Sequence, residues 1–255
     1  MSQTIDAQTL VQFCDDYLHA HEFQDYCPNG LQVDADTPIS HIITGVTASQ
    51  ALIEIAIAKK ANAILVHHGY FWKGESQVLT GMKGKRVRTL MQNGISMIAY
   101  HLPLDAHTSI GNNAILAKEL DLTIVAPLFA HEKHPVGNIA ECEPIAASQL
   151  ADKIAKVLGR TPLHISNDPN RTLRKIGLCT GGAQDMIEQA AKMGCDAFIS
   201  GEISERTTHA ARELNIDYFA AGHHATEKGG IRELGKLIAD KLGVSVEFVD
   251  IDNPA

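Results

Sequence analysis

The sequence predicts an α/β fold, on the evidence of two patterns. From Ile39 to the end of the chain, short apolar runs alternate with longer segments whose apolar residues recur at helical spacing. Parallel strands need a crossover connection, usually a helix, so this alternation favours mostly parallel sheets with helices on both faces, which is a three-layer arrangement.

The expected elements begin with an amphipathic helix over Ala7–His19, followed by a turn at Pro28–Gly30. The expected strands are Ile39–Thr44, Ala63–Val66, Ser96–Tyr100, Thr123–Val125, Gly137–Ala140, Leu163–Ile165, Lys175–Cys179, Asp196–Ile199, Asp217–Ala220 and Ser245–Val249. The expected helices between and after them are Gln50–Lys60, Lys85–Gln92, Asn113–Leu120, Ser148–Leu158, Asp185–Met193, Ser204–Leu214 and Ile231–Leu242.

The composition is that of a folded, soluble protein. The 255 residues are 45% hydrophobic and 20% charged, and the formal net charge of −8 disfavours general binding to nucleic acid or to an anionic membrane. No apolar run approaches the roughly 20 residues of a membrane-spanning helix. Five dispersed cysteines without a C-x-x-C pair, and no secretory signal, predict a cytoplasmic location.

Two segments of the chain resemble each other weakly. In each, a glycine (Gly45 or Gly177) opens a turn, a helix follows, and a buried strand ends in polar residues. The similarity is either an internal repeat or the pattern that any two βαβ units share. A repeat would give two α/β lobes across a cleft. Because the periodic pattern breaks near Pro127, the expected lobes are residues 1–127 with 223–255, and residues 128–222.

Four polar clusters directly follow apolar strands, and open α/β sheets bind ligands at that end of their strands. These clusters hold five of the 13 histidines. They are VHHG (66–69), YHLPLD (100–105), ISGE (199–202) and AGHHATE (221–227).

Each candidate ligand taken alone has an ordinary structural explanation. His67 and His68 suit capping or packing at a strand end. His223 and Glu227 suit an i, i+4 pair on a helix, and Asp105 suits a turn or a helix start. Together, however, three imidazoles and two carboxylates form a mixed ligand set for Zn²⁺, Fe²⁺ or Mn²⁺. Five ligands exceed the usual three of a mononuclear catalytic site, so we expect two divalent metal ions per chain.

Longer motifs support this interpretation across nearly the whole chain. They are CPNGLQV (27–33), LVHHGYFWKGE (65–75), YHLPLDAH (100–107), GNNA (111–114), CTGGAQ (179–184), FISGE (198–202) and AGHHATEKGGIR (221–232). By these motifs the sequence resembles the GTP cyclohydrolase 1 type 2 homologues, also called NGG-interacting-factor-three-like proteins, in their compact bacterial form.

The resemblance implies a specific metal centre and assembly. His68 and Asp105 would hold one ion, His67 and His223 the other, and Glu227 would bridge them. The resemblance also implies two interlinked lobes with the metals in the cleft between them, and a homohexameric ring around an internal cavity.

The expected function is metal-dependent hydrolysis of a small anionic, nucleotide-like substrate, as the resemblance to GTP cyclohydrolase implies. His101 and Glu202 are the candidate catalytic residues. Either has an ordinary alternative, since His101 suits an outer partner that orients a ligand and Glu202 suits a helix start. The alternative function is that of a non-enzymatic, metal-loaded oligomer with an interaction, regulatory or metal-handling role.

Overall fold

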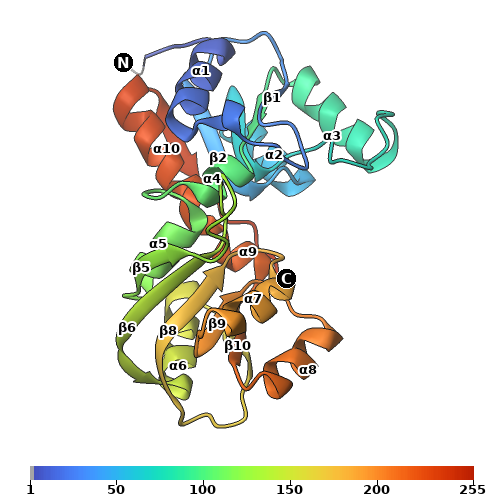
Figure 1. Ribbon diagram of the computed structural model, residues 1–255. Helices are drawn as coiled ribbons and strands as arrows, with labels where there is room; N and C mark the ends of the chain where they lie inside the picture. The colour runs from blue at the N-terminus through green and yellow to red at the C-terminus, as the bar shows by residue number, and fades with distance from the viewer. Residues whose placement is uncertain (1–2) are drawn as a thin grey trace. The chain divides into compact units, whose positions relative to one another are not determined.

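The structure, a computed structural model, describes residues 3–255 (Figure 1). It divides into two compact units, Met1–Leu104 with Gly230–Asp252, and Asp105–Gly229 with Asn253–Ala255. In the described part of the chain each unit is built on one sheet with helices, so the α/β prediction is confirmed.

The first unit contains a five-stranded sheet in which all neighbours are parallel except the edge strand β1. In spatial order its strands are β1 (Gly30–Val33), β4 (Ser96–Ala99), β3 (Ala63–His68), β2 (His41–Thr47) and β11 (Ser245–Phe248). Its helices are α1 (Ala7–Leu18), η1 (Ala20–Glu22), α2 (Gln50–Ala58), α3 (Gly81–Gln92) and α10 (Lys228–Leu242).

Side chains that alternate along the strands bury both faces of this sheet. Ile43 and Ile64 pack with the apolar stripes of α2 and α3 in one core cluster. On the opposite face α10 approaches β2 so closely that a Cβ at Gly235 would lie 3.1 Å from Thr44 Cγ2. Figure 1 shows α1 and α10 on one side of the strands and α2 and α3 on the other, which is the predicted three-layer arrangement.

The second unit contains a six-stranded sheet. In spatial order its strands are β5 (Thr123–Pro127), β6 (Asn138–Ala146), β8 (Thr172–Cys179), β9 (Ala197–Ser200), β10 (Asp217–Ala220) and β7 (Leu163–Ile165). Its helical elements are α4 (Leu102–Ala106, which enters from the first unit), α5 (Asn112–Glu119), α6 (Ala147–Leu158), η2 (Gln184–Met186), α7 (Ile187–Lys192), α8 (Glu205–Glu213) and α9 (His223–Thr226).

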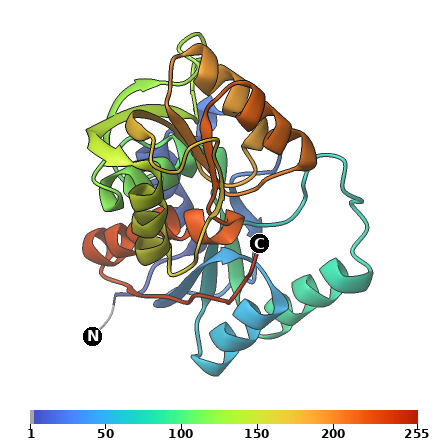
Figure 2. The same ribbon diagram turned by 90° about the horizontal axis from the view of Figure 1, so that it is seen from below.

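Two apolar clusters lie on opposite faces of the second sheet. Ile176 and Ile199 pack with α5 and α6, whereas Phe198, which precedes Ile199 in β9, and Tyr218 in β10 pack with α7 and α8. In Figure 2 the olive α6 and the orange α7 and α8 lie on opposite sides of the strands. The layers of this unit are therefore also three.

The expectation of mostly parallel strands is wrong for the second sheet. Among its described pairings, β5/β6, β6/β8 and β10/β7 are antiparallel, and only β8/β9 and β9/β10 are parallel. No helix lies in the connection 128–137 between β5 and β6. Without a crossover helix the chain reverses direction and the two strands pair antiparallel.

The units also differ from the lobes expected at residues 127/128 and 222/223. The segment 105–127 lies in the second unit because α5 contributes Leu116 and Leu120 to its core and β5 pairs with β6. Residues 223–229 belong to the same unit. No helix within residues 3–255 has both the length and the apolar character needed to cross a membrane.

Candidate metal centre

His67 and His68 end strand β3 in the first unit. His67 is fully buried, and its Nδ1 lies 2.9 Å from the carbonyl oxygen of Tyr100. Because a carbonyl only accepts, the ring proton is on Nδ1 and the lone pair is on Nε2, which is the form of histidine that binds metals. His68 is half-buried, with Nδ1 3.3 Å from Thr47 Oγ1.

The two adjacent histidines are brought to one side although neighbours in a regular strand point to opposite faces. Their ring centroids are 4.6 Å apart, so the chain leaves the pleat where β3 ends. The following Gly69 is needed for space, because a Cβ there would lie 2.8 Å from Ala99 Cβ and would overlap the side chain of Gln32.

His101 lies two residues after the end of β4 and is held by a buried carboxylate. Its Nδ1 donates to Asp25 Oδ1 over 2.7 Å, and the Asp25 side chain is 2% exposed. Burial raises the pKa of Asp25, but hydrogen bonds from His101, Asn29 and the Leu102 backbone, with the charge of His101, bring it below its ordinary value. Asp25 is therefore an anion that fixes the orientation of the His101 ring.

The first unit thus brings three predicted site residues together. The His101 ring lies 5.1 Å from that of His67 and 5.7 Å from that of His68. Ligand nitrogens of the three rings lie within 4.8 Å of one another, a grouping that could hold a metal ion. Trp72 meets His101 edge-on with ring centroids 5.0 Å apart.

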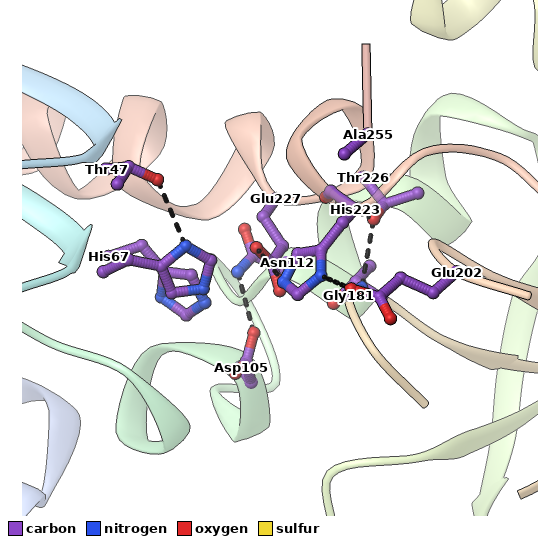
Figure 3. A network of polar contacts seen from close by, with 12 residues as sticks. Thr47, His67, Asp105, Asn112, Gly181, Glu202, His223, Thr226, Glu227 and Ala255 are labelled. Carbon is purple, nitrogen blue, oxygen red and sulfur yellow. Dashed lines mark hydrogen bonds and ion pairs between the residues drawn. The ribbon is translucent and has the colours of Figure 1, made fainter. Parts of the chain in front are cut away.

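In the second unit, His223 lies between two carboxylates. It begins α9 and directly follows Gly222, whose φ is +98°. Its Nδ1 is 2.6 Å from Glu202 Oε1 and its Nε2 is 3.2 Å from Glu227 Oε2 (Figure 3). Burial lowers the pKa of His223, but the hydrogen bonds and charges of Glu227 and Glu202 outweigh it and raise the pKa to about 9.

Glu227 depends on a glycine in the loop after β8. Glu227 is only 3% exposed, and a Cβ at Gly181 would overlap its Oε1. The backbone of Gly181 has a φ of +69° and its N–H donates to Thr226 Oγ1 over 3.1 Å (Figure 3). Only glycine combines this left-handed backbone with so close an approach of the carboxylate.

Asp105 is buried on α4 and is held by an amide. Asn112 Nδ2, fully buried, donates to Asp105 Oδ1 over 2.8 Å. Asn112 begins α5, so the short connection between the two helices fixes the carboxylate. Carboxylate oxygens are common ligands of divalent ions, so Asp105 is a candidate metal ligand that this hydrogen bond positions.

The chain matches a known protein family over nearly its whole length. The model of the family Duf34/NIF3 (NGG1p interacting factor 3) matches residues 5–254. The chain belongs to the Duf34/NIF3 family. The resemblance drawn from the sequence motifs is thereby confirmed.

Relatives of this Duf34/NIF3 chain align with it over nearly its full length. A protein of Vibrio cholerae named "GTP cyclohydrolase 1 type 2 homolog" is 54% identical over 96% of this chain and 98% of its own. A Haemophilus influenzae protein of the same name is 53% identical over the same shares. Among solved structures, protein ybgI, described as of unknown function, has a TM-score of 0.94 at 45% identity, covering 98% of this chain and 100% of its own. TTHA1606 from Thermus thermophilus has a TM-score of 0.89 at 30% identity with the same coverage.

The donors present in the Duf34/NIF3 chain suit a divalent ion. Zinc bonds of about 2.0–2.2 Å to nitrogen and oxygen place two ligand atoms about 3.4 Å apart in a tetrahedral site. His223 Nε2 and Glu227 Oε2 are 3.2 Å apart. The distance between this imidazole nitrogen and this carboxylate oxygen is therefore close to that of two ligands of one ion.

Four supporting residues were not predicted from the sequence. They are Asp25, Thr47, Asn112 and Gly181, and all contact a predicted site residue. Three of these contacts join residues far apart in the chain, which spacing cannot reveal. Asn112 and Gly181 lie in the GNNA and CTGGAQ motifs, and these motifs were the sequence signal that could have identified them.

Proposed function

We propose that this Duf34/NIF3 protein binds two divalent metal ions per chain and hydrolyses a small anionic, nucleotide-like substrate. In this proposal His68 and Asp105 bind one ion, His67 and His223 bind the other, and Glu227 bridges. The observation that carries the proposal is the position of His223 Nε2, 3.2 Å from Glu227 Oε2, with Nδ1 held by Glu202. A carboxylate behind a metal-binding histidine is the usual outer partner of such a ligand.

The combination of donors from both units into one centre is supported by the path of the chain. The chain passes from the first unit to the second between Leu104 and Asp105, and returns between Gly229 and Gly230. The first crossing adjoins Asp105, and the second is within three residues of Glu227. Both carboxylate ligands of the proposal thus belong to the segments that connect the units.

The roles of the chain's own residues follow from their contacts. Bound divalent ions would supply acidification of a water and polarisation of a substrate oxygen. Glu202, expected as a catalytic residue, contacts His223 and positions it. His101, with its Nδ1 proton held by Asp25, offers Nε2 to accept or donate a proton.

The substrate class rests on charge and on relatives. Two bound cations would set the local field and attract an anion despite the net charge of −8. The name that the relatives carry makes GTP the first compound to test. The homohexameric ring and the cytoplasmic location expected from the sequence belong to the same proposal.

The test is turnover with known metal content. We expect the metal-loaded protein to convert GTP or another member of a nucleotide panel, and the Glu227→Ala variant to lose this conversion. The control is Glu205→Ala, because the Glu205 side chain is 85% exposed and lies 2.8 Å from the surface residue His209. Full metal occupancy without turnover of any compound would contradict the enzymatic proposal and favour a metal-loaded interaction protein.

A further inference from the structure

Two aromatic side chains of the first unit, Trp72 and Tyr26, lie beside the histidines and are not among the proposed metal ligands. The ring centroid of Trp72 is 5.0 Å from that of His101 and 5.9 Å from that of His68. The ring of Tyr26 is 6.5 Å from that of His101. Trp72 is half-buried and Tyr26 is 62% exposed, so packing in the core does not explain the position of Tyr26.

The side chain of Trp72 is held by a tight turn over residues 71–75. Its Nε1 donates to the carbonyl oxygen of Gly69 over 3.2 Å, and Glu75 Oε2 accepts from the backbone N–H groups of Phe71 and Trp72 at 3.1 and 3.3 Å. Phe71 has a φ of +63°, a left-handed conformation that is costly for a bulky residue. Such strain is kept where surrounding contacts enforce it, commonly at ligand sites. The turn therefore fixes the indole in advance of ligand binding.

The backbone of Tyr26 is attached to the same turn. Its carbonyl oxygen accepts from the N–H of Lys73 over 2.6 Å, so the backbones that carry the two aromatic side chains are adjacent. The N–H of Tyr26 donates to Asp25 Oδ1 over 2.6 Å, and the same oxygen accepts from His101 Nδ1. The contacts that orient His101 thus also fix the position of Tyr26.

These two side chains have the chemistry that recognises a planar aromatic ring. The plane of Trp72 makes angles of 82° with His101 and 56° with His68, so neither imidazole stacks face to face on the indole. Bases of nucleotides stack on tryptophan and tyrosine, and loss of one such side chain lowers affinity by about 5- to 100-fold. Because both rings have few rotatable bonds and Trp72 is already held, little conformational entropy is lost when a base binds.

We propose that Trp72 and Tyr26 bind the heteroaromatic base of a nucleotide-like ligand by stacking. This inference rests on the proposed function for the class of substrate, and it adds a base-binding site that the metal ligands do not supply. Two divalent ions would attract phosphate of any kind, whereas an aromatic surface selects ligands that carry a base. Purines should bind better than pyrimidines, because their ring surface is larger.

The chain offers a direct probe of this site. Trp72 is the single tryptophan of the 255 residues, so the tryptophan fluorescence of the full-length protein reports on this side chain alone. We expect guanosine and adenosine, which carry a base and no phosphate, to quench this fluorescence in a saturable manner. Ribose 5-phosphate, which has no base, should leave it unchanged. Absence of quenching by both nucleosides, or equal quenching by ribose 5-phosphate, would overturn the inference.

Substitutions separate stacking from a purely structural role. Trp72→Leu and Tyr26→Leu should each weaken guanosine binding by about 5- to 100-fold in equilibrium dialysis, whereas Trp72→Phe, which keeps an aromatic ring, should stay within about threefold of the wild type. The matched control is Val78→Ala, because Val78 is 63% exposed in the same loop and has no ring, so this variant should bind guanosine as the wild type does. Guanosine affinity that is unchanged in both leucine variants would overturn the inference.

Two further readouts keep the test decisive. Inorganic triphosphate should bind the metal-loaded leucine variants as it binds the wild type, and an equal loss of triphosphate and guanosine binding would assign the aromatic residues a structural role and overturn the inference. Circular dichroism checks folding, and the exposed Tyr26→Leu covers the case in which Trp72→Leu fails to fold. Saturable quenching by guanosine without turnover of any nucleotide refutes only the proposed hydrolysis, whereas turnover of GTP without quenching refutes only the base-binding site.

Discussion

Metal binding at His223 should displace a proton, and the structure gives the size of the effect. The pKa of His223 is raised to about 9 by Glu227 and Glu202, against the effect of burial. At pH 7 only about 1% of this imidazole is neutral, so its deprotonation costs about 2.7 kcal/mol of binding free energy. Since a metal binds the neutral ring, affinity should rise about tenfold per pH unit from pH 7 to 9 and level off above that.

The slope can be assigned to His223 because an ordinary histidine is already neutral in this range. Glu202→Gln removes one of the two carboxylates that face the ring, so the pKa of His223 should fall and the rise in affinity should move to lower pH. The variant also loses the charge that orients the ring. Above pH 9, where deprotonation no longer matters, its affinity should be about 10- to 100-fold below that of the wild type.

The assay is isothermal titration calorimetry with Zn²⁺ in buffers of different ionisation enthalpy, which counts protons released. We expect the wild type to release about one proton more per chain at pH 7 than at pH 9.5, and Glu202→Gln to show a smaller difference. Glu205→Gln, a change at an exposed carboxylate, should match the wild type. An affinity that does not change between pH 7 and 9 would refute the reasoning about His223.

Two further substitutions test the supporting contacts of the second unit. Gly181→Ala should weaken metal binding strongly, because the new Cβ would overlap Glu227 Oε1. The matched control is Gly159→Ala, which is also at positive φ but has no atom within 4 Å of the position of its Cβ. The control should lower folding stability by only about 1–2 kcal/mol and leave metal affinity unchanged. Equal metal affinity in the two variants would exclude a steric role for Gly181. Asn112→Ala should lower metal affinity about 10- to 100-fold by releasing Asp105 Oδ1, as measured by equilibrium dialysis, and an unchanged affinity would show that this hydrogen bond does not position the carboxylate.

The sequence predicted the four parallel strands of the first sheet because their pattern is local, but it did not predict the antiparallel edge strand β1. In β3, five of six residues are buried, and the helices α2 and α3, which precede and follow it in the chain, carry apolar residues that pack on one face of the sheet. The second sheet was harder to predict. Strand β6 runs to Ala146, beyond the expected end at Ala140, and its residues after Ala140 are largely exposed or half-buried, so they lack the apolar run that marks a buried strand.

The site could be predicted in part for a similar reason. The position of polar residues at strand ends singled out His67, His68 and His101, and the first unit brings these three together. Asp25 could not be found this way, because it lies in an irregular loop and is 76 residues from His101 in sequence. Spacing indicates which residues share an element, whereas partners contributed by another loop are determined by the tertiary fold.

The central claim is tested most directly by counting metal ions. The full-length protein would be dialysed to saturation against Zn²⁺, Mn²⁺ or Fe²⁺ and its metal content measured per chain, beside Glu227→Ala. We predict two ions per chain in the wild type with at least one of these metals, and fewer than two in the variant. A wild type that binds fewer than two ions per chain at saturation with every metal would contradict the dinuclear centre.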